Sequence, residues 1–146
     1  ALPIYNHSMS AEKDTLRGLH FQLNPKSQTK LIRCTKGRIL DVVVDLRKGS
    51  TTYKKWVAVE LTSEDKKQLL IPKGFAHGFI TLTNDVEVQY KVDEYYSPEN
   101  DRCIRFDDPD LGIDWGFENP HLSKKDSNAP LFMNYDGIFK YMESED

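Results

Sequence analysis

Two histidines stand in apolar, strand-like stretches of the sequence, each with a glycine and a cation nearby. His20 lies in residues 16–22, and His77 lies in residues 71–79. Imidazole has an ordinary pKa close to neutrality, so these positions indicate proton transfer, metal ligation or a buried hydrogen bond. A structural core histidine is the alternative for either residue alone. Arg17 and Lys30 favour a ligand site, because cations beside a buried histidine suit an anionic ligand.

Metal ligation is the weakest of these interpretations. His77 follows a Pro-Lys-Gly turn at the start of a strand, an arrangement frequent in double-stranded β-helix (cupin) domains. A cupin metal site usually adds a His-x-His pair and a glutamate from an earlier strand, whereas the earlier stretch offers only His20. Most metal sites need at least three protein ligands, so we expect no metal here.

Tyrosines and a carboxylate provide further candidates. Tyr90 lies in a strand-like stretch, and Tyr96 precedes a Ser-Pro turn. Such tyrosines usually pack in a core, but one that faces a histidine across a pocket can donate a proton, and another can stack on a base. Residues 105–115 have the composition of a turn at the surface. Residues Ser123 to Asp126 fit an N-cap and first helical turn, the ordinary explanation of a carboxylate at that position.

The composition predicts an ordinary globular protein. The chain has 146 residues, 38% hydrophobic and 29% charged, which fits one domain over 1–146. Its hydrophobic runs are shorter than the roughly 20 residues of a membrane span, and the net charge of −3 argues against general binding to nucleic acid. The first five residues lack signal-peptide features, and Cys34 and Cys103 have no metal-type spacing, so we expect two buried free thiols and a cytoplasmic location.

Short runs of β-branched and aromatic residues, separated by turn signals, predict strands and a sandwich or small barrel. The predicted strands cover residues 30–34, 38–46, 56–61, 68–72, 77–82, 86–92 and 103–106. Residues 39–46 are apolar on both faces, which we interpret as a dimer contact. Near the C-terminus, residues 131–133 with Ile138, Phe139, Tyr141 and Met142 predict a short helix packed on the barrel.

Taken together and in order, six motifs resemble the dTDP-4-dehydrorhamnose 3,5-epimerase family. They are residues 16–22, 30–33, 41–50, 71–79, 95–98 and 111–115, and the similarity runs from about Asn6 to Pro130. The resemblance implies an all-β, double-stranded β-helix (cupin or jelly-roll) barrel with a short C-terminal helical segment, usually a homodimer. It further implies a metal-independent isomerase without cofactor that converts dTDP-4-keto-6-deoxy-D-glucose to dTDP-4-keto-L-rhamnose.

The resemblance also implies residue roles. His20 matches the general base, Asp126 its partner carboxylate and Tyr90 the general acid. The matched substrate-binding positions are Arg17, Lys30 and His77 for the sugar and diphosphate, Tyr96 for stacking on thymine, Asn6 in the nucleotide site, and Gln22, Asp101 and Lys125 as further ligand positions.

One departure concerns the start of the sequence. Family members normally carry a segment before the Asn6 region with an Arg-Gly-x-Phe-x-Glu stretch that helps to bind the nucleotide. The printed sequence has no such stretch, and Ile4-Tyr5-Asn6 replaces the family's Gln-Asp-Asn. The resemblance therefore predicts either a natural short form, for this or another nucleotide sugar, or a truncated product. A mono-epimerase for another deoxysugar, a non-catalytic sugar-nucleotide-binding protein and, remotely, a metal-dependent oxygenase remain alternatives.

Overall fold

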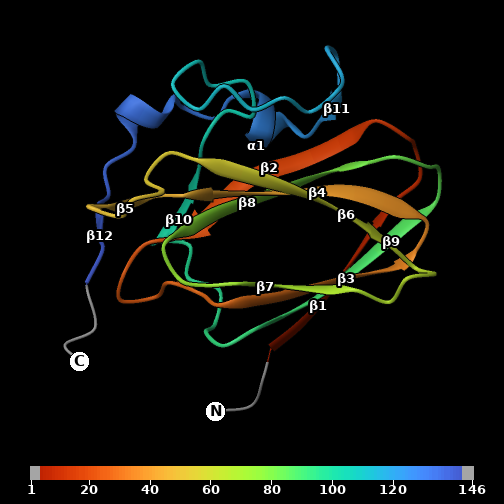
Figure 1. The fold of residues 1–146 in the computed structure, drawn as a ribbon, viewed down its shortest axis with the longest axis horizontal. Helices are drawn as coiled ribbons and strands as arrows, with labels where there is room; N and C mark the ends of the chain where they lie inside the picture. The colour runs from red at the N-terminus through yellow and green to blue at the C-terminus, as the bar shows by residue number, and fades with distance from the viewer. Residues whose placement is uncertain (1–3, 143–146) are drawn as a thin grey trace.

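The computed structural model describes residues 4–142, and two β-sheets facing each other form its barrel (Figure 1). The four-stranded sheet has the order β1 (Ile4–Ser10), β9 (Val86–Val92), β3 (Lys30–Lys36), β7 (Gln68–Ile71). The six-stranded sheet has the order β10 (Asp101–Cys103), β2 (Thr15–Gln22), β8 (Phe75–Thr81), β4 (Arg38–Asp45), β6 (Trp56–Thr62), and β11 (His121–Leu122) pairs with β2. A small third sheet joins β5 (Arg47–Lys48) to β12 (Phe139–Lys140), and the helices are α1 (Lys124–Ser127) and the 3-10 helix η1 (Phe132–Asn134).

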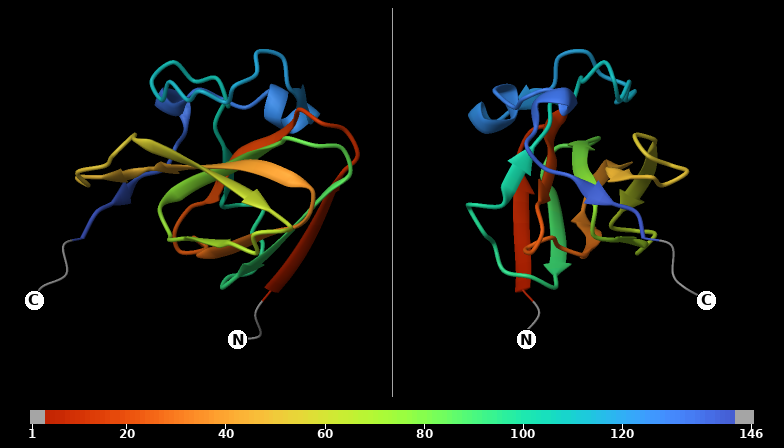
Figure 2. Two further views of the ribbon diagram at one scale, coloured as in Figure 1. Left: turned by 45° about the vertical axis from the view of Figure 1, so that its right-hand side comes forward. Right: turned by 90° about the vertical axis from the view of Figure 1, so that its left-hand side faces the viewer.

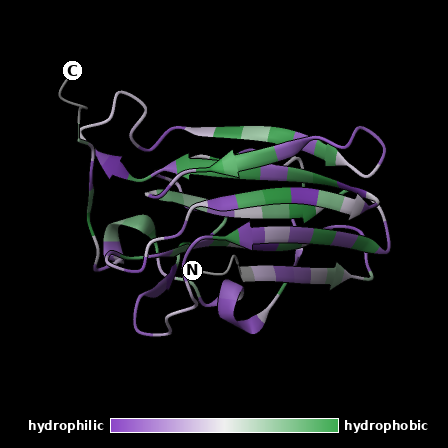
Figure 3. Ribbon diagram, turned by 90° about the horizontal axis from the view of Figure 1, so that it is seen from below, coloured by the Kyte–Doolittle hydropathy of each residue, from purple (hydrophilic) through white to green (hydrophobic). Residues whose placement is uncertain are grey.

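Alternating side chains build the strands of the barrel. In β9, Val86, Val88 and Val92 are buried, whereas the residues between them are more exposed. Figure 3 shows the resulting mixture of hydrophobic and hydrophilic residues along the strands. This period of two gives each sheet one face for the barrel interior. The all-β jelly-roll prediction is confirmed, and each predicted strand overlaps an observed one, although β10 shares only Cys103 with its predicted range.

Two apolar clusters stabilise this arrangement. One lies between the sheets and includes Ile32, Ile39 and Val43. The other lies on the opposite face of the six-stranded sheet, where residues 104–139 of the same chain cover it (Figure 2). In β4, Val43 packs into the first cluster and Val42 into the second, so both faces of this strand are buried. Its two edges pair with β8 and β6. The prediction that residues 39–46 form a dimer contact is therefore wrong, because the chain itself covers both faces.

The C-terminal segment differs in part from the predicted helix. Residues 131–133 overlap η1, whose Phe132 N–H donates to the buried Asp108 carboxylate at 2.6 Å. Phe139 instead belongs to β12, where pairing with β5 carries its ring into the apolar cluster. Of the apolar residues predicted to pack on the barrel after η1, only Phe139 is buried, and strand pairing rather than a helical face buries it. The prediction is wrong for Ile138, Tyr141 and Met142, which are exposed.

The described residues also bear on two expectations from composition. No helix within residues 4–142 is long and apolar enough to cross a membrane. Cys34 and Cys103 are both free thiols; Cys34 is buried as predicted, whereas Cys103 is only partly buried.

Candidate active site

A bulge in β2 turns Arg17 and His20 toward the same side of the six-stranded sheet. The register between β2 and β8 shifts between these residues, and such an extra residue re-aims the side chains that follow it. Gly18, at φ +137°, and Gly78 make the close approach of the paired strands β2 and β8 possible, because a Cβ on Gly18 would lie 2.6 Å from Gly78 Cα. Beyond the bulge His20 pairs directly with His77 of β8.

His20 is held by a carboxylate that arrives from a distant part of the chain. Its Nε2 lies 2.5 Å from Oδ1 of Asp126, whose side chain is almost fully buried. Ser123 caps helix α1 by accepting a hydrogen bond from the Asp126 N–H, as predicted, and Gly18 N–H donates to Asp126 Oδ2 at 3.3 Å. Burial acts to raise the pKa of Asp126, but the hydrogen bond and charge of His20 outweigh it and hold that pKa below its ordinary value. Asp126 is thus an anion that lies against the imidazole and fixes the orientation of its ring.

The facing sheet supplies Tyr90 and Lys30. Tyr90 occupies the inward row of β9, and Lys30 the inward row of β3, where the next inward residue is Ile32. Burial raises the pKa of Tyr90 despite the opposing effect of Arg17, so its phenol keeps its proton at neutral pH. Burial also lowers the pKa of Lys30 to about 8, against the raising effect of Asp101 and Asp41.

Two adjoining cavities between the sheets collect the candidates. They share His20, Lys30 and Tyr90. The first, here called the Tyr96 cavity, has about 260 Å³ and is also lined by Asn6, Gln22, Gln28, Tyr96, Asp101 and Lys125. The second, the His77 cavity, has about 170 Å³ and is also lined by Ser8, Arg17, His77 and Phe79. Asp126 lies behind His20, so the structure brings all the candidate residues to one site.

A second histidine–carboxylate pair lies at the wall of the His77 cavity, which His77 lines and Asp41 does not. His77 Nε2 is 2.9 and 3.0 Å from the two carboxylate oxygens of Asp41, which is fully buried on β4. Asp41 was not among the predicted site residues. Its signal was a charged residue in the middle of β4, directly between Leu40 and Val42, since a buried carboxylate needs a partner.

Several of the polar groups around the cavities are already engaged. Arg17 donates to Ser10 Oγ at 3.2 Å and to the Met9 carbonyl at 3.1 Å, which ties it to the end of β1. Lys125 Nζ lies 2.5 Å from Asp101 Oδ2, so these two form an ion pair at the cavity wall. Within residues 4–142, no group of three or more His, Cys, Asp or Glu residues is placed to hold a metal ion.

The site can therefore perform acid–base chemistry on an anionic ligand. An imidazole oriented by a buried carboxylate lies on one sheet, and a protonated phenol lies on the other. Comparison with known proteins agrees with this interpretation: residues 4–134 match the family described as dTDP-4-dehydrorhamnose 3,5-epimerase. The chain belongs to that family.

Individual relatives extend the agreement over most of the chain. The dTDP-4-dehydrorhamnose 3,5-epimerase of Sinorhizobium fredii is 50% identical over 139 residues, which cover 94% of this chain and 71% of that protein. A crystal structure of the Bacillus anthracis enzyme with TDP and PPi bound is 53% identical, with a TM-score of 0.87, over 88% of this chain and 74% of that one. The Legionella pneumophila enzyme, in complex with dTDP-4-keto-L-rhamnose, has a TM-score of 0.90 and 42% identity over 96% of this chain and 75% of that one.

Proposed function

We propose that this protein epimerises dTDP-4-keto-6-deoxy-D-glucose at C3 and C5 to give dTDP-4-keto-L-rhamnose. The observation that carries the proposal is the placement of the His20–Asp126 pair and of Tyr90 around one cavity, on opposite sheets. The family membership and the product bound to the Legionella relative support the same substrate class.

His20 acts as the base in this proposal. A C–H bond next to the C4 ketone is acidic because its electron pair can move into the carbonyl, which forms an enolate. The proton passes to His20, and Asp126 stabilises the resulting imidazolium. Negative charge gathers on the C4 oxygen, where Lys30 and His77 are the donors we assign to stabilise it.

Tyr90 supplies the proton that completes the inversion. The enolate carbon takes the phenolic proton from the face opposite His20, and the electron pair returns from the C4 oxygen to re-form the ketone. Solvent then reprotonates the phenolate and removes the proton from His20. A second cycle at the other carbon gives double epimerisation, and release after one cycle gives a mono-epimerase.

The remaining residues bind the nucleotide sugar in this proposal. Arg17 supplies charge for the diphosphate, and Tyr96 supplies a ring for stacking on thymine. Asn6, Asp101 and Lys125 line the same Tyr96 cavity and complete its polar wall.

Deuterium uptake tests the function directly. The substrate is incubated with the protein in D2O, and NMR follows C3 and C5 before any reductase is added. Uptake at both carbons is the expected result. Uptake at one carbon would identify a mono-epimerase, and no uptake with tight dTDP binding would identify a non-catalytic binder.

We also propose that the protein is a homodimer that uses the outer face of the four-stranded sheet. Tyr5, Met9 and Leu70 are exposed there by 51%, 70% and 64%, on β1 and β7, which end this sheet. Arg33 and Lys91 add positive charge around a depression of about 240 Å³ on this face. Sedimentation equilibrium should give a dimer for the wild type and a monomer for Leu70→Glu; a monomeric wild type would overturn this surface.

A further inference from the structure

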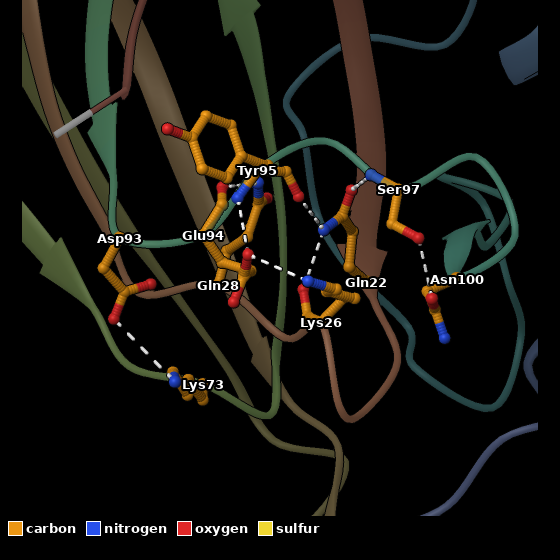
Figure 4. Close-up of polar contacts among 9 residues, drawn as sticks. All are labelled: Gln22, Lys26, Gln28, Lys73, Asp93, Glu94, Tyr95, Ser97 and Asn100. Atoms are coloured by element: carbon orange, nitrogen blue, oxygen red, sulfur yellow. Dashed lines mark hydrogen bonds and ion pairs between the residues drawn. The ribbon is translucent and has the colours of Figure 1, made fainter. Parts of the chain in front are cut away.

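The side chain of Gln22 holds together two loops at the end of β2. Gln22 is the last residue of β2 and is only 4% exposed, although it lines the Tyr96 cavity. Its Nε2 donates to the Lys26 carbonyl at 2.7 Å and to the Tyr95 carbonyl at 3.2 Å, and its Oε1 accepts from the Ser97 N–H at 2.9 Å (Figure 4). Two acceptors and one donor around the amide fix its orientation, because the reverse orientation would satisfy none of them.

These bonds leave Gln22 little capacity to bind a ligand. Both N–H groups of the amide are in use, and only one lone pair of the oxygen is left. The prediction that Gln22 binds substrate directly stays a prediction, but its contacts favour an indirect role. Leaving a buried amide without its hydrogen-bond partners costs free energy, so the three bonds of Gln22 are kept together. They act as one anchor between the two loops.

The anchor holds the part of the loop that carries Tyr96. Residues 93–100 are tied to residues 23–29 at both ends, through Gln28 to the Glu94 carbonyl and through Leu23 N–H to the Asn100 carbonyl (Figure 4 shows the Gln28 contact). Apart from the local bond in which the Asp101 N–H donates to the Ser97 carbonyl at 3.0 Å, the hydrogen bonds that join residues 95–97 to the described chain outside residues 93–100 all end on Gln22. The residue enclosed by the two anchored positions is Tyr96.

The ring of Tyr96 has little packing of its own. Its residue is 66% exposed, although it lines the cavity. The position of an exposed ring depends on the backbone that carries it. Gln22 holds that backbone on both sides of Tyr96, at the Tyr95 carbonyl and the Ser97 N–H. The acid–base residues His20 and Tyr90, by contrast, are held by their strands and by Asp126.

We propose that Gln22 is a positioning residue that sets the Tyr96 ring over the cavity and thereby the affinity for the nucleobase end of the substrate. This inference rests on the proposed function for the identity of the ligand. Its effect falls on binding, because Gln22 touches neither His20–Asp126 nor Tyr90. Gln22 acts through the turn at residues 95–97.

The test uses Gln22→Met, which keeps the length of the side chain and removes its hydrogen bonds. We expect the Kd for dTDP and the KM for the nucleotide sugar to rise about tenfold, within the range that stacking of one base on an aromatic ring contributes. The kcat should stay within about threefold of wild type, since transition-state interactions are retained. In a Tyr96→Ala background, Gln22→Met should change the Kd by less than about twofold, because the two residues act as one unit.

A control and a second readout keep the test decisive. Asn84→Leu removes another amide that ties two loops, through the Lys13 N–H, at the other end of β2, and should leave the Kd for dTDP unchanged. In the wild type, the Ser97 amide should exchange slowly with solvent, and in Gln22→Met, which has no acceptor for it, it should exchange fast. This exchange needs no ligand, so it tests the anchor even if the wild type neither binds dTDP nor takes up deuterium.

Several outcomes would overturn the inference. They are an unprotected Ser97 amide in the wild type, an unchanged Kd for dTDP in Gln22→Met, and additive effects of Gln22→Met and Tyr96→Ala. A fall in kcat as large as the rise in KM would also contradict a positioning role. Failure of the proposed function is a separate result, seen as no deuterium uptake by the wild type.

Discussion

Replacing Asp126 with Asn removes the charge that faces His20 while keeping the size of the side chain. Asp126 accepts from two donors, the His20 ring and the Gly18 N–H. An asparagine has a single oxygen, so one of these donors loses its acceptor in either amide orientation. The buried site can therefore no longer both orient the imidazole and compensate its positive charge.

The size of the effect follows from the charge pair. Two unit charges about 4 Å apart, at an effective dielectric constant of about 20, attract by about 4 kcal/mol. If Asp126 stabilises the imidazolium by this amount in the transition state, its loss lowers kcat by about a thousandfold. The lost hydrogen bond should lower the free energy of unfolding by about 1–2 kcal/mol, so the protein should still fold.

The assay is the rate of deuterium uptake at C3 and C5 with saturating substrate. Both carbons should slow together, because one base serves both. Asp107→Asn is the matched control: Asp107 pairs with Arg105 at 2.9 Å on the surface and touches no cavity residue. A kcat within about tenfold of wild type for Asp126→Asn would refute the assigned role, since a buried charge pair should contribute more.

Three further predictions concern the opposite sheet and the bulge. Tyr90→Phe should lower kcat by about a hundredfold or more while the Kd for dTDP stays unchanged, and an unchanged rate of product formation would count against Tyr90 as the acid. Because burial lowers the pKa of Lys30 to about 8, its ammonium is charged below that pH and neutral above it. A pH profile of kcat/KM should therefore fall as pH rises through about 8, and Lys30→Arg should move this fall to higher pH. Gly18→Ala should lower the free energy of unfolding by about 2–4 kcal/mol in denaturant titrations, because its Cβ would meet Gly78 Cα at 2.6 Å and overpacking is added to backbone strain. A loss below about 0.5 kcal/mol would contradict the close approach of the β2 and β8 backbones.

The strands of the barrel were predictable because their pattern is local. Alternation and turn residues predicted β9 with its observed bounds, and the capping position of Ser123 was also correct. The segment after η1 was not predictable in this way, because Phe139 is buried by pairing with a strand more than ninety residues earlier. Apolar spacing in such a short segment does not distinguish a helix from a strand that pairs at long range.

The candidate residues that the structure brings together were named from the sequence, but their contacts were not. The resemblance gave His20, Asp126 and Tyr90, yet Asp41 had no role until the structure placed it against His77. The hydrogen bonds of Gln22 could not be predicted either. Its position in a motif does not show that its amide binds backbone groups of two loops. Side-chain contacts between distant segments depend on the register in which the strands pair. Local sequence patterns do not determine that register for strands that are far apart in the chain.

The two histidine–carboxylate pairs differ in exposure, and this difference supports the proposed tasks independently of the resemblance. His20 and His77 are neighbours across β2 and β8, and each has a buried carboxylate partner. A general base must return its proton to solvent after each turnover. The His20 side chain is 34% exposed and can do so, whereas the His77 side chain is 8% exposed and lies against a fully buried Asp41. Exposure therefore favours His20 as the group that exchanges protons, and burial favours His77 as a fixed donor to the oxygen where negative charge develops.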